Sequence, residues 1–370
     1  MKILIITLEY PPNIGGISGY VSQYAGHFKP EEVVVLAPSV IKGADFDGAS
    51  PWKVIRAKLF YSFVWPHWLR LFFIVRKIIK QEGITTMHVH HVLPVGYVAY
   101  FLNKFNILRS YTVFLHGTDI ARATSQSRKL SWFKKICQQA EKIVVNSRFL
   151  ERRVREYNDE TPMVVVNPCP APYFLEQANP EFIQKLRAHL ALSGKKVLLT
   201  VGRMVDGKGF PLGIGLLPEL LKQIPNIVWV MVGSGPKRDE IIAMVQKNNL
   251  QNAVRFLGEL SPEQLPPLYQ AADAFVLLTH PDGGVEEGWG TVFLEASASG
   301  IPVVAGMSGG VEEAVENSVT GYVVEAHHAD QAVNKIVELL KDPSRAKAIG
   351  AAGKARVLNE FTWDKQLVKL

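Results

Sequence analysis

The sequence has little cysteine and no long uninterrupted apolar run. Its 370 residues include two cysteines, Cys137 and Cys169, which provide neither a disulfide framework nor the paired spacing of a metal site. The apolar stretch 59–75 contains Pro66, His67 and Arg70, so it does not predict a membrane-spanning helix. The opening MKILIITLEY has a short apolar run without a cleavage site and predicts a first buried strand. These absences lead us to expect a cytoplasmic protein.

Several short motifs are also missing. The turn IGGISGY at 14–20 does not have the GxGxxG spacing of a dinucleotide site. Alternation in HVHH places His88 and His90 on one face of a strand, but no acidic residue lies nearby. We therefore predict no metal and no bound cofactor.

The length and the strand pattern predict an α/β protein of two domains. Apolar residues make up 48% of the chain and charged residues 20%, as in folded globular proteins. Short apolar strands alternate with helical patterns in both halves, which is typical of doubly wound Rossmann-like sheets. The segment NPCPAPYF at 167–174 has three prolines and is interpreted as a connector. The predicted domains are residues 1–168 and 169–370.

The elements of each half can be placed approximately. The predicted strands of the first half are 2–8, 32–37, 86–90, 111–115, 142–146 and 163–166, with helices near 18–28, 67–82, 95–105, 127–140 and 147–157. Those of the second half are 197–201, 227–232, 254–257, 274–278, 302–305 and 321–324, with helices near 211–224, 237–248, 263–271, 291–299, 310–316, 329–341 and 344–360.

Positive charge is concentrated in the first half. Residues 1–168 carry 22 Lys and Arg against 12 Asp and Glu, whereas residues 169–370 carry 19 against 22. This asymmetry indicates an anionic partner, and because no nucleic-acid recognition motif is present we predict no nucleic-acid partner. Aromatic residues alternate with cations over 52–80, which suits a membrane interface. A core helix with a solvated basic face is the other interpretation, and the sequence leaves both open.

The richest motif is EEGWGTVFLEASASGIPVVAG at 286–306. Glu287 precedes a predicted helix and Glu295 lies about one turn into it, with a glycine-containing turn between them. Helix N-termini bind phosphate, and ionised carboxylates accept hydrogen bonds from sugar hydroxyls. The combination predicts a nucleotide-sugar site.

Two other strand ends carry candidate residues. In VGRMVDGKGF at 201–210, Arg203 and Lys208 follow a strand and could neutralise a diphosphate, although such a pair is more often solvated. In HGTD at 116–119, His116 and Asp119 follow the strand TVFL, although a histidine there is more often packed than catalytic.

Taken together, six segments resemble the family-4 retaining glycosyltransferases of GT-B fold. The segments are EYPPNIGG (9–16), HGTD (116–119), GRMVDGKG (202–209), VGSGP (232–236), EEGWGTVFLEASASGIPVVAG (286–306) and SGGVEEAV (308–315). The resemblance implies two Rossmann-like domains facing a cleft. It also implies catalytic roles for His116, Arg203, Lys208 and Glu287. Implied donor contacts are Gly16, Gly233, Leu257, Gly288, Trp289, Gly290, Thr291 and Glu295. Together with this resemblance, we predict that Glu9, Tyr10 and Asp119 contact the acceptor.

The EGWG variant and the basic, aromatic first domain are most similar to bacterial phosphatidylinositol mannosyltransferase-like enzymes. The resemblance implies metal-independent transfer of a hexose, with mannose preferred, from a GDP- or UDP-sugar to a lipid-linked or membrane-associated acceptor, by a protein peripheral on the inner face of the membrane. A soluble acceptor such as a sugar phosphate, and a nucleotide-binding regulatory protein without turnover, stay open as alternatives. The connector NPCPAPYF departs from the family pattern, and the C-terminal helix is expected to be short.

Overall fold

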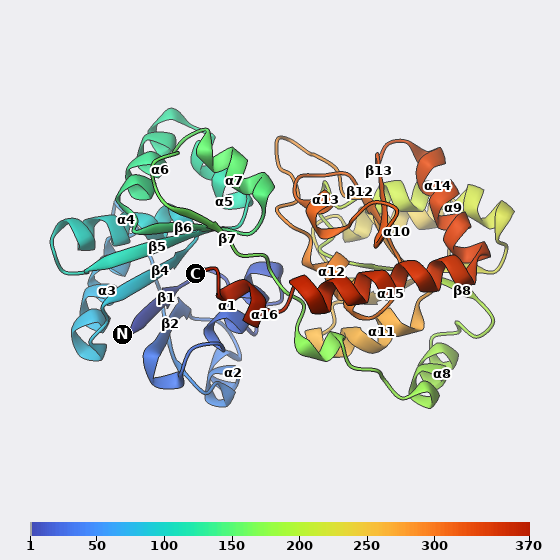
Figure 1. Cartoon of the computed structure of the whole chain (residues 1–370), viewed down its shortest axis with the longest axis horizontal. Coiled ribbons are helices and arrows are strands. Elements are labelled where there is room, and N and C mark those ends of the chain that lie inside the picture. Colours follow the sequence, from blue (N-terminus) through green and yellow to red (C-terminus); the bar gives the residue numbers. More distant parts are fainter. Residues whose placement is uncertain (1) are drawn as a thin grey trace. The chain divides into compact units, whose positions relative to one another are not determined.

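The computed structural model describes residues 2–370 and divides the chain into two compact units. Unit 1 comprises Met1–Pro168 and Gln366–Leu370, and unit 2 comprises Cys169–Lys365. Each unit has one parallel sheet flanked by helices (Figure 1). The α/β class with two Rossmann-like units, predicted from the sequence, is confirmed.

The sheet of unit 1 has seven strands in the order β3-β2-β1-β4-β5-β6-β7. The chain builds outward from β1 in one direction and then returns to β4 on its other side, so the order of winding reverses between β1 and β4. Ligands bind beyond the carboxyl ends of strands at such a point. The strands are β1 (Ile3–Ile6), β2 (Val33–Pro38), β3 (Lys53–Ala57), β4 (Thr86–His90), β5 (Ser110–Leu115), β6 (Lys142–Val145) and β7 (Met163–Val165).

Strand alternation sends different residues to the two faces of this sheet. Met87 and Val89 of β4 belong to the apolar core that packs beneath α3 and α4, whereas His88 and His90 lie on the opposite face. There both histidine rings contact Tyr24 of α1. The helices of unit 1 are α1 (Gly16–Ala25), α2 (Gly43–Ala49), α3 (Leu69–Glu82), α4 (Val92–Lys104), α5 (Thr118–Thr124), α6 (Ser127–Gln139) and α7 (Arg148–Arg155).

The sheet of unit 2 has six strands in the order β10-β9-β8-β11-β12-β13, with the reversal between β8 and β11. Its central strands are buried on both faces, so their sequences are continuously apolar, as in IVWVMV of β9. The strands are β8 (Lys196–Val201), β9 (Ile227–Val232), β10 (Val254–Gly258), β11 (Ala274–Leu277), β12 (Val303–Gly306) and β13 (Gly321–Val324). The helices are α8 (Pro180–His189), α9 (Phe210–Gln223), α10 (Arg238–Lys247), α11 (Leu265–Ala271), α12 (Thr291–Ala298), α13 (Val311–Ala314), α14 (Ala329–Lys341) and α15 (Pro343–Glu360).

Four elements were not expected from the sequence: β3, α2, α5 and α8. Three of them are helices of ten residues or fewer, and β3 is an edge strand with only half-buried or exposed residues, so each has a weak periodic signal. The short C-terminal helix that was expected is α16 (Trp363–Leu367). The predicted second domain also needs a correction, because Gln366–Leu370 belongs to unit 1. The Gln366 side chain accepts a hydrogen bond from the backbone N–H of Asn167 at 2.9 Å.

Among residues 2–370, no helix combines the length and the apolar character that crossing a bilayer requires.

Candidate active site

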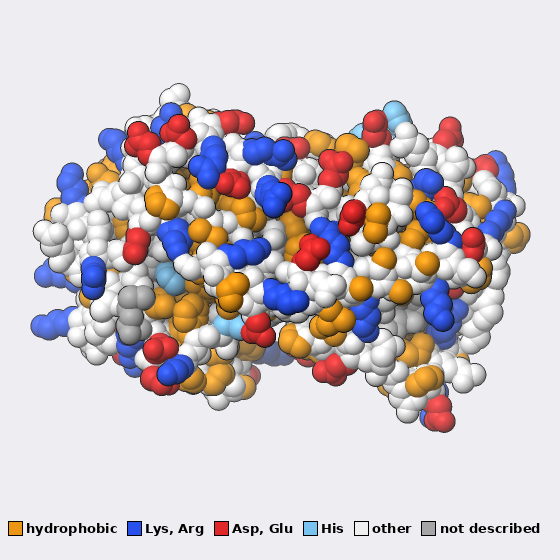
Figure 2. Space-filling model, in the orientation of Figure 1, with side chains coloured by type: hydrophobic (Ala, Val, Ile, Leu, Met, Phe, Trp, Pro, Cys, Tyr) orange, Lys and Arg blue, Asp and Glu red, His pale blue; other side chains and the backbone are white. Residues whose placement is uncertain are grey.

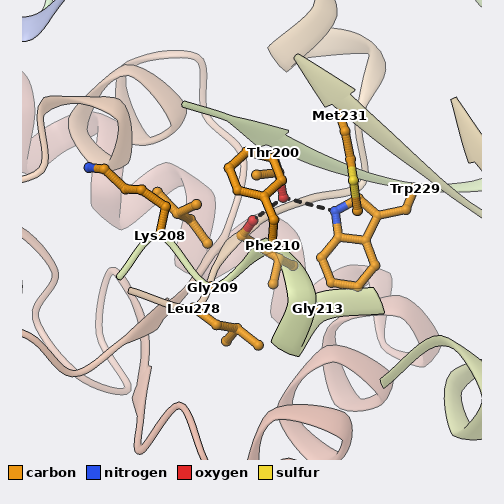
Figure 3. A pocket seen from close by; sticks show the side chains of 10 residues that line it. Thr200, Lys208, Gly209, Phe210, Gly213, Trp229, Met231 and Leu278 are labelled. Carbon is orange, nitrogen blue, oxygen red and sulfur yellow. Dashed lines mark hydrogen bonds between the residues drawn. The ribbon is translucent and has the colours of Figure 1, made fainter. Parts of the chain in front are cut away.

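Lys208 lies in the turn between β8 and α9, at the carboxyl edge of the sheet of unit 2. Its Nζ donates to Oε2 of Glu287, which follows β11. Figure 3 shows the Lys208 side chain extending away from Phe210 and Trp229, toward the outside of the turn. The reversal between β8 and β11 therefore brings together two residues that are 79 positions apart in the sequence.

Glycine is required to form this turn. Gly209 has φ +74° and is the N-cap of α9, and a Cβ at this position would lie 2.0 Å from the carbonyl oxygen of Leu278. Gly207 has φ +79°, and its carbonyl accepts from the backbone N–H of His280 at 2.9 Å. The turn that carries Lys208 is thus clamped to the segment that follows β11.

The backbone of Glu287 is held by the segment after β12. Its N–H donates to Oγ of Ser308 at 3.1 Å, and its carbonyl accepts from the N–H of Gly310 at 2.9 Å. Gly309 has φ +55°, and a Cβ there would lie 2.1 Å from the carbonyl oxygen of Glu287. Segments after three neighbouring strands therefore fix the Lys208–Glu287 pair.

The N-terminus of α12 follows directly after Glu287. Gly290 is the N-cap with φ +85°, and no side chain caps the helix. The first amides of a helix have no partner within the helix, and here the first turn also contains no acidic residue. Gly288, Gly290 and Thr291 thus form a start to α12 that can receive an anion.

Glu295, on the second turn of α12, has a different environment from Glu287. Its Oε2 accepts a hydrogen bond from the hydroxyl of Tyr269 at 2.9 Å. Burial raises the pKa of the Glu295 carboxyl to about 7, and the Tyr269 hydrogen bond opposes that rise. Near neutral pH this carboxyl is poised between its two protonation states.

The raised pKa of Glu295 makes stability depend on pH. In the unfolded chain the carboxyl titrates near its ordinary value of 4.5, so between pH 4.5 and about 7 the folded state binds more protons. Raising the pH through this window therefore destabilises the nucleotide-free protein, by at most about 3 kcal/mol. We expect Glu295→Gln to remove this loss. Urea unfolding at pH 5 and pH 8 should show a smaller decrease in the free energy of unfolding for the variant than for the wild type. An equal decrease in both proteins would contradict the raised pKa of Glu295.

Three glycine-containing turns interlock beside the site. Gly233 has φ +127°, donates its N–H to the carbonyl of Gly258 at 2.7 Å, and would carry a Cβ 2.0 Å from the carbonyl oxygen of Gly202. Leu257 precedes Gly258 on β10 and is half-buried. Arg203 follows Gly202; its side chain is exposed and has no ion-pair partner among residues 2–370. A guanidinium is therefore held near the end of β8 without a protein counter-ion.

The interior beneath the Lys208 turn is packed rather than hollow. A cavity of about 10 Å³ lies between Thr200, Phe210 and Trp229, at the lower limit for one water molecule (Figure 3). Trp229 Nε1 donates to Oγ1 of Thr200 at 2.9 Å across it. The side chain of Trp289, a predicted donor contact, is also buried, with its ring 5.4 Å from that of Phe361. The indole ring of Trp289 is therefore not available to contact a ligand.

In unit 1, His116 lies at the carboxyl end of β5. Its Nε2 is 3.1 Å from Nδ1 of His90, and the edge of the Tyr20 ring packs on it with 5.2 Å between centroids. Burial lowers the pKa of His116 to about 3, with the nearby His91 lowering it further and Glu9 opposing the shift. His90 is also buried, which lowers its pKa well below the ordinary value. Both imidazoles are therefore neutral near pH 7.

Two of the residues predicted to contact the acceptor are buried. Asp119 is one of them, and its Oδ1 accepts from the backbone N–H groups of His116, Gly117 and Ile120 at 2.9–3.0 Å, so it fixes the loop of His116. Tyr10 is also fully buried, and its hydroxyl accepts from Trp52 Nε1 at 2.9 Å.

Two predicted residues of the first turns stay accessible. Glu9 is exposed, with Oε1 3.8 Å from Nε2 of His91. Gly16 opens α1, and a Cβ there would meet nothing within 4 Å.

Sequence reasoning missed three residues that support the site. His90 contacts His116, Tyr269 contacts Glu295, and Ser308 holds Glu287. The alternation of HVHH correctly placed His88 and His90 on one face, but not their partners. His88 bonds the hydroxyl of Tyr24 through Nδ1 at 2.9 Å. Only tertiary contacts assign these roles.

Comparison with known proteins identifies the class of this protein. The family model "Glycosyltransferase Family 4" matches residues 14–169, and the model "Glycosyl transferases group 1" matches residues 182–356. Together they span both units. The chain belongs to the glycosyltransferases, and its two Rossmann-like units form the GT-B fold.

Among curated proteins, the chain is similar over its whole length to bacterial mannosyltransferases. It is 27% identical to the GDP-mannose-dependent alpha-(1-6)-phosphatidylinositol monomannoside mannosyltransferase of Mycobacterium tuberculosis, over 100% of this chain and 97% of that protein. It is 28% identical to the GDP-mannose-dependent monoacylated alpha-(1-6)-phosphatidylinositol monomannoside mannosyltransferase of Corynebacterium glutamicum, over 98% of this chain and 95% of that protein.

Solved structures share the fold. HepE of Anabaena, crystallised in complex with UDP, superposes with a TM-score of 0.82 at 20% identity and covers 100% of this chain and 98% of its own. Sucrose-phosphate synthase of Thermosynechococcus elongatus superposes with a TM-score of 0.81 at 23% identity. The match covers 99% of this chain and 96% of that structure.

Proposed function

We propose that this glycosyltransferase is a retaining mannosyltransferase that uses GDP-mannose and a lipid-linked acceptor. The observation that carries the proposal is the Lys208–Glu287 pair beside the uncapped start of α12. The full-length similarity to mannosyltransferases named as GDP-mannose-dependent supports the choice of donor. HepE, which has the same fold, binds UDP, and this supports a nucleotide diphosphate as the ligand class.

In this proposal the donor diphosphate binds at the carboxyl edge of β8 and β11. Lys208 and Arg203 neutralise it, and the amides at Gly290 and Thr291 donate to its oxygens. Glu287, which accepts a hydrogen bond from Lys208, also accepts from hydroxyls of the donor sugar. Glu295 accepts from the ribose hydroxyls, which favours its ionised form and releases a proton on binding.

The reaction breaks the bond between the anomeric carbon and the phosphate oxygen. The electron pair leaves with the nucleoside diphosphate, and the cations and helix amides stabilise the negative charge that develops there without a metal ion. The acceptor hydroxyl attacks the anomeric carbon from the same face, so the configuration is retained. Its proton passes to an oxygen of the departing phosphate, which balances the step.

His116 contributes a neutral imidazole that donates to a sugar hydroxyl, and His90 sets its tautomer. Nε2 of His90 is buried without a hydrogen-bond partner. A buried N–H without an acceptor is costly, so the proton of His90 resides on Nδ1 and is donated to Nε2 of His116. His116 therefore carries its own proton on Nδ1, which bonds no other residue among 2–370.

Replacing His90 tests this role. We expect His90→Phe, which keeps an aromatic ring against Phe114, to lower kcat about fivefold to tenfold with little change in the KM for the donor. Nitrogen-15 spectra should show His116 as the Nδ1–H tautomer in the wild type and a shift toward Nε2–H in the variant. An unchanged tautomer would contradict the assignment of the proton.

A transfer assay tests the function as a whole. Protein is incubated with labelled GDP-mannose or UDP-glucose and a bacterial phospholipid extract, and label in the organic phase is counted. We expect transfer from GDP-mannose, unaffected by EDTA, with an α-linked product by proton spectroscopy. Label found only in water-soluble product would support a soluble acceptor, and a β-linked product would refute retention.

A further inference from the structure

Helix α15 packs closely against α12, at whose start the proposed donor diphosphate binds. Glycine permits this approach, since a Cβ at Gly350 would lie 2.1 Å from the carbonyl oxygen of Gly300. A Cβ at Gly353 would lie 3.1 Å from the side chain of Ser297 on α12. Figure 1 shows α15 as the long helix that runs beside α12 in unit 2. Figure 2 shows acidic and basic side chains over this stretch of unit 2, so the outer face of α15 is solvated.

Arg356, near the end of α15, caps the last turn of α13 with its guanidinium group. Its two terminal nitrogens donate to the carbonyl oxygens of Glu313 and Ala314, at 2.9 and 3.1 Å. These are the last two residues of α13, and the final carbonyls of a helix have no partner within the helix. The side chain of Arg356 is only 19% exposed, so water competes little for these hydrogen bonds.

The other end of α13 is bonded to the candidate site. Its N-cap, Gly310, donates its backbone N–H to the carbonyl of Glu287 at 2.9 Å. Glu287 donates its own N–H to Oγ of Ser308 at 3.1 Å. Because α13 is only four residues long, it connects Arg356 to the backbone of Glu287 over a single turn.

A second contact reaches the same segment through aromatic rings. Trp289 lies between Gly288 and Gly290, in the turn that precedes α12, and its ring is buried. The ring of Phe361, which follows α15, packs against that of Trp289 with 5.4 Å between centroids. The guanidinium of Arg356 lies over the Phe361 ring, 5.0 Å from its centroid. Arg356 therefore supports the segment 287–290 by two routes, one through α13 and one through Phe361.

The acidic neighbours of Arg356 contribute little to this arrangement. Its Nε lies 3.3 Å from Oε2 of Glu360 on the same helix and 4.0 Å from Oε2 of Glu316. Both carboxylates are more than half exposed, and ion pairs of this kind are weak. The specific contacts are thus the two hydrogen bonds to α13 and the stacking on Phe361, which the planar guanidinium makes together.

We propose that Arg356 is a positioning residue for the donor site, acting through Glu287 and the turn of Trp289. It fixes the backbone of both, so that the Glu287 carboxylate and the first amides of α12 keep the separation at which a nucleotide-sugar binds. Preorganised binding depends on supporting residues that hold such groups to within about 0.5 Å. The inference rests on the proposed function, because the groups it positions are those of the proposed diphosphate site.

Nucleotide binding by the full chain tests the proposal. We expect Arg356→Ala to weaken GDP binding about fivefold to tenfold in calorimetric titration, because the start of α12 is no longer held in one geometry. Millimolar ethylguanidinium, which supplies the atoms that the substitution removes, should restore most of the lost affinity. Arg345→Ala is the control on the same helix, at a side chain that is 46% exposed. It should change the affinity less than about twofold and should not respond to ethylguanidinium.

Amide hydrogen exchange, measured without nucleotide, separates positioning from a general loss of stability. In Arg356→Ala we expect faster exchange confined to residues 286–293 and 308–315, because these two segments lose their common support. Phe361→Leu should show the same pattern with a smaller loss of GDP affinity. It replaces Arg356→Ala as the test if that variant does not fold.

Two outcomes would overturn the role of Arg356. One is GDP affinity that neither variant changes, and the other is exchange that becomes faster throughout unit 2. Failure of the proposed function looks different, because the wild-type chain itself would then bind neither GDP nor UDP. Wild-type binding with unaffected variants would refute only the positioning role.

Discussion

Lys208→Ala is expected to lower kcat/KM for the nucleotide-sugar about 10²- to 10³-fold, which is the usual loss when one group that stabilises developing negative charge is removed. Lys208 is the cation fixed most firmly at the carboxyl edge of β8, because the turn is clamped to the segment after β11 and Glu287 holds the ammonium group. The affinity for GDP should decrease in parallel, since the same cation binds the product diphosphate. Initial rates and calorimetric titration with GDP measure the two effects.

Two control variants sharpen this result. Lys208→Arg keeps the charge and should retain much of the activity, with some loss because a guanidinium has a different shape. Lys222→Ala removes a lysine paired with a glutamate at 3.0 Å on the exposed side of α9 and should leave kinetics unchanged. If Lys208→Ala binds GDP as tightly as the wild type, the diphosphate is not held by Lys208.

Gly209→Ala is expected to destabilise the protein by about 3–5 kcal/mol, through overpacking and a strained backbone together. The added Cβ would lie 2.0 Å from the carbonyl oxygen of Leu278 and 2.5 Å from its carbon, and the residue has φ +74°. Leu278 directly follows β11, which is paired with a strand on each side, so its backbone is held in place. Urea unfolding followed by circular dichroism measures the change.

Gly215→Ala is the matched control, because it makes the same substitution in α9, which begins directly after Gly209. Gly215 is exposed and a Cβ there would meet nothing within 4 Å, so alanine should stabilise the helix by about 0.5–1 kcal/mol. We therefore expect the free energy of unfolding to decrease for Gly209→Ala and to increase for Gly215→Ala. If Gly209→Ala is as stable as the wild type, the close approach to Leu278 does not constrain the turn.

The sequence predicted the sheets of both units well, because parallel strands buried on both faces have continuous apolar runs. All six strands of unit 2 lie where those runs indicated, from β8 to β13. The elements that were missed are short or exposed: β3 has charged residues at both ends of its apolar pair, and α5 spans only seven residues. Local periodicity is too weak in such segments to distinguish a helix or strand from a loop.

For the candidate site, the sequence predicted residues but not the contacts that hold them. That Lys208 bonds Glu287, and that Glu295 instead bonds Tyr269, depends on which strands are neighbours. The sequence also marked Asp119 as a contact for an acceptor, because an aspartate at a strand end resembles a ligand-binding residue. One of its carboxylate oxygens, Oδ1, accepts from three backbone N–H groups, a local arrangement that spacing alone does not distinguish from ligand binding.

We propose that unit 2 binds a nucleoside diphosphate at the turn of Lys208 and the start of α12. Calorimetric titration of the full chain with GDP and with UDP, with and without EDTA, is the first test of this binding site. We expect one-site binding of GDP that EDTA does not change and that Lys208→Ala weakens at least tenfold. Binding of neither nucleotide, or binding that Lys208→Ala leaves unchanged, would contradict it.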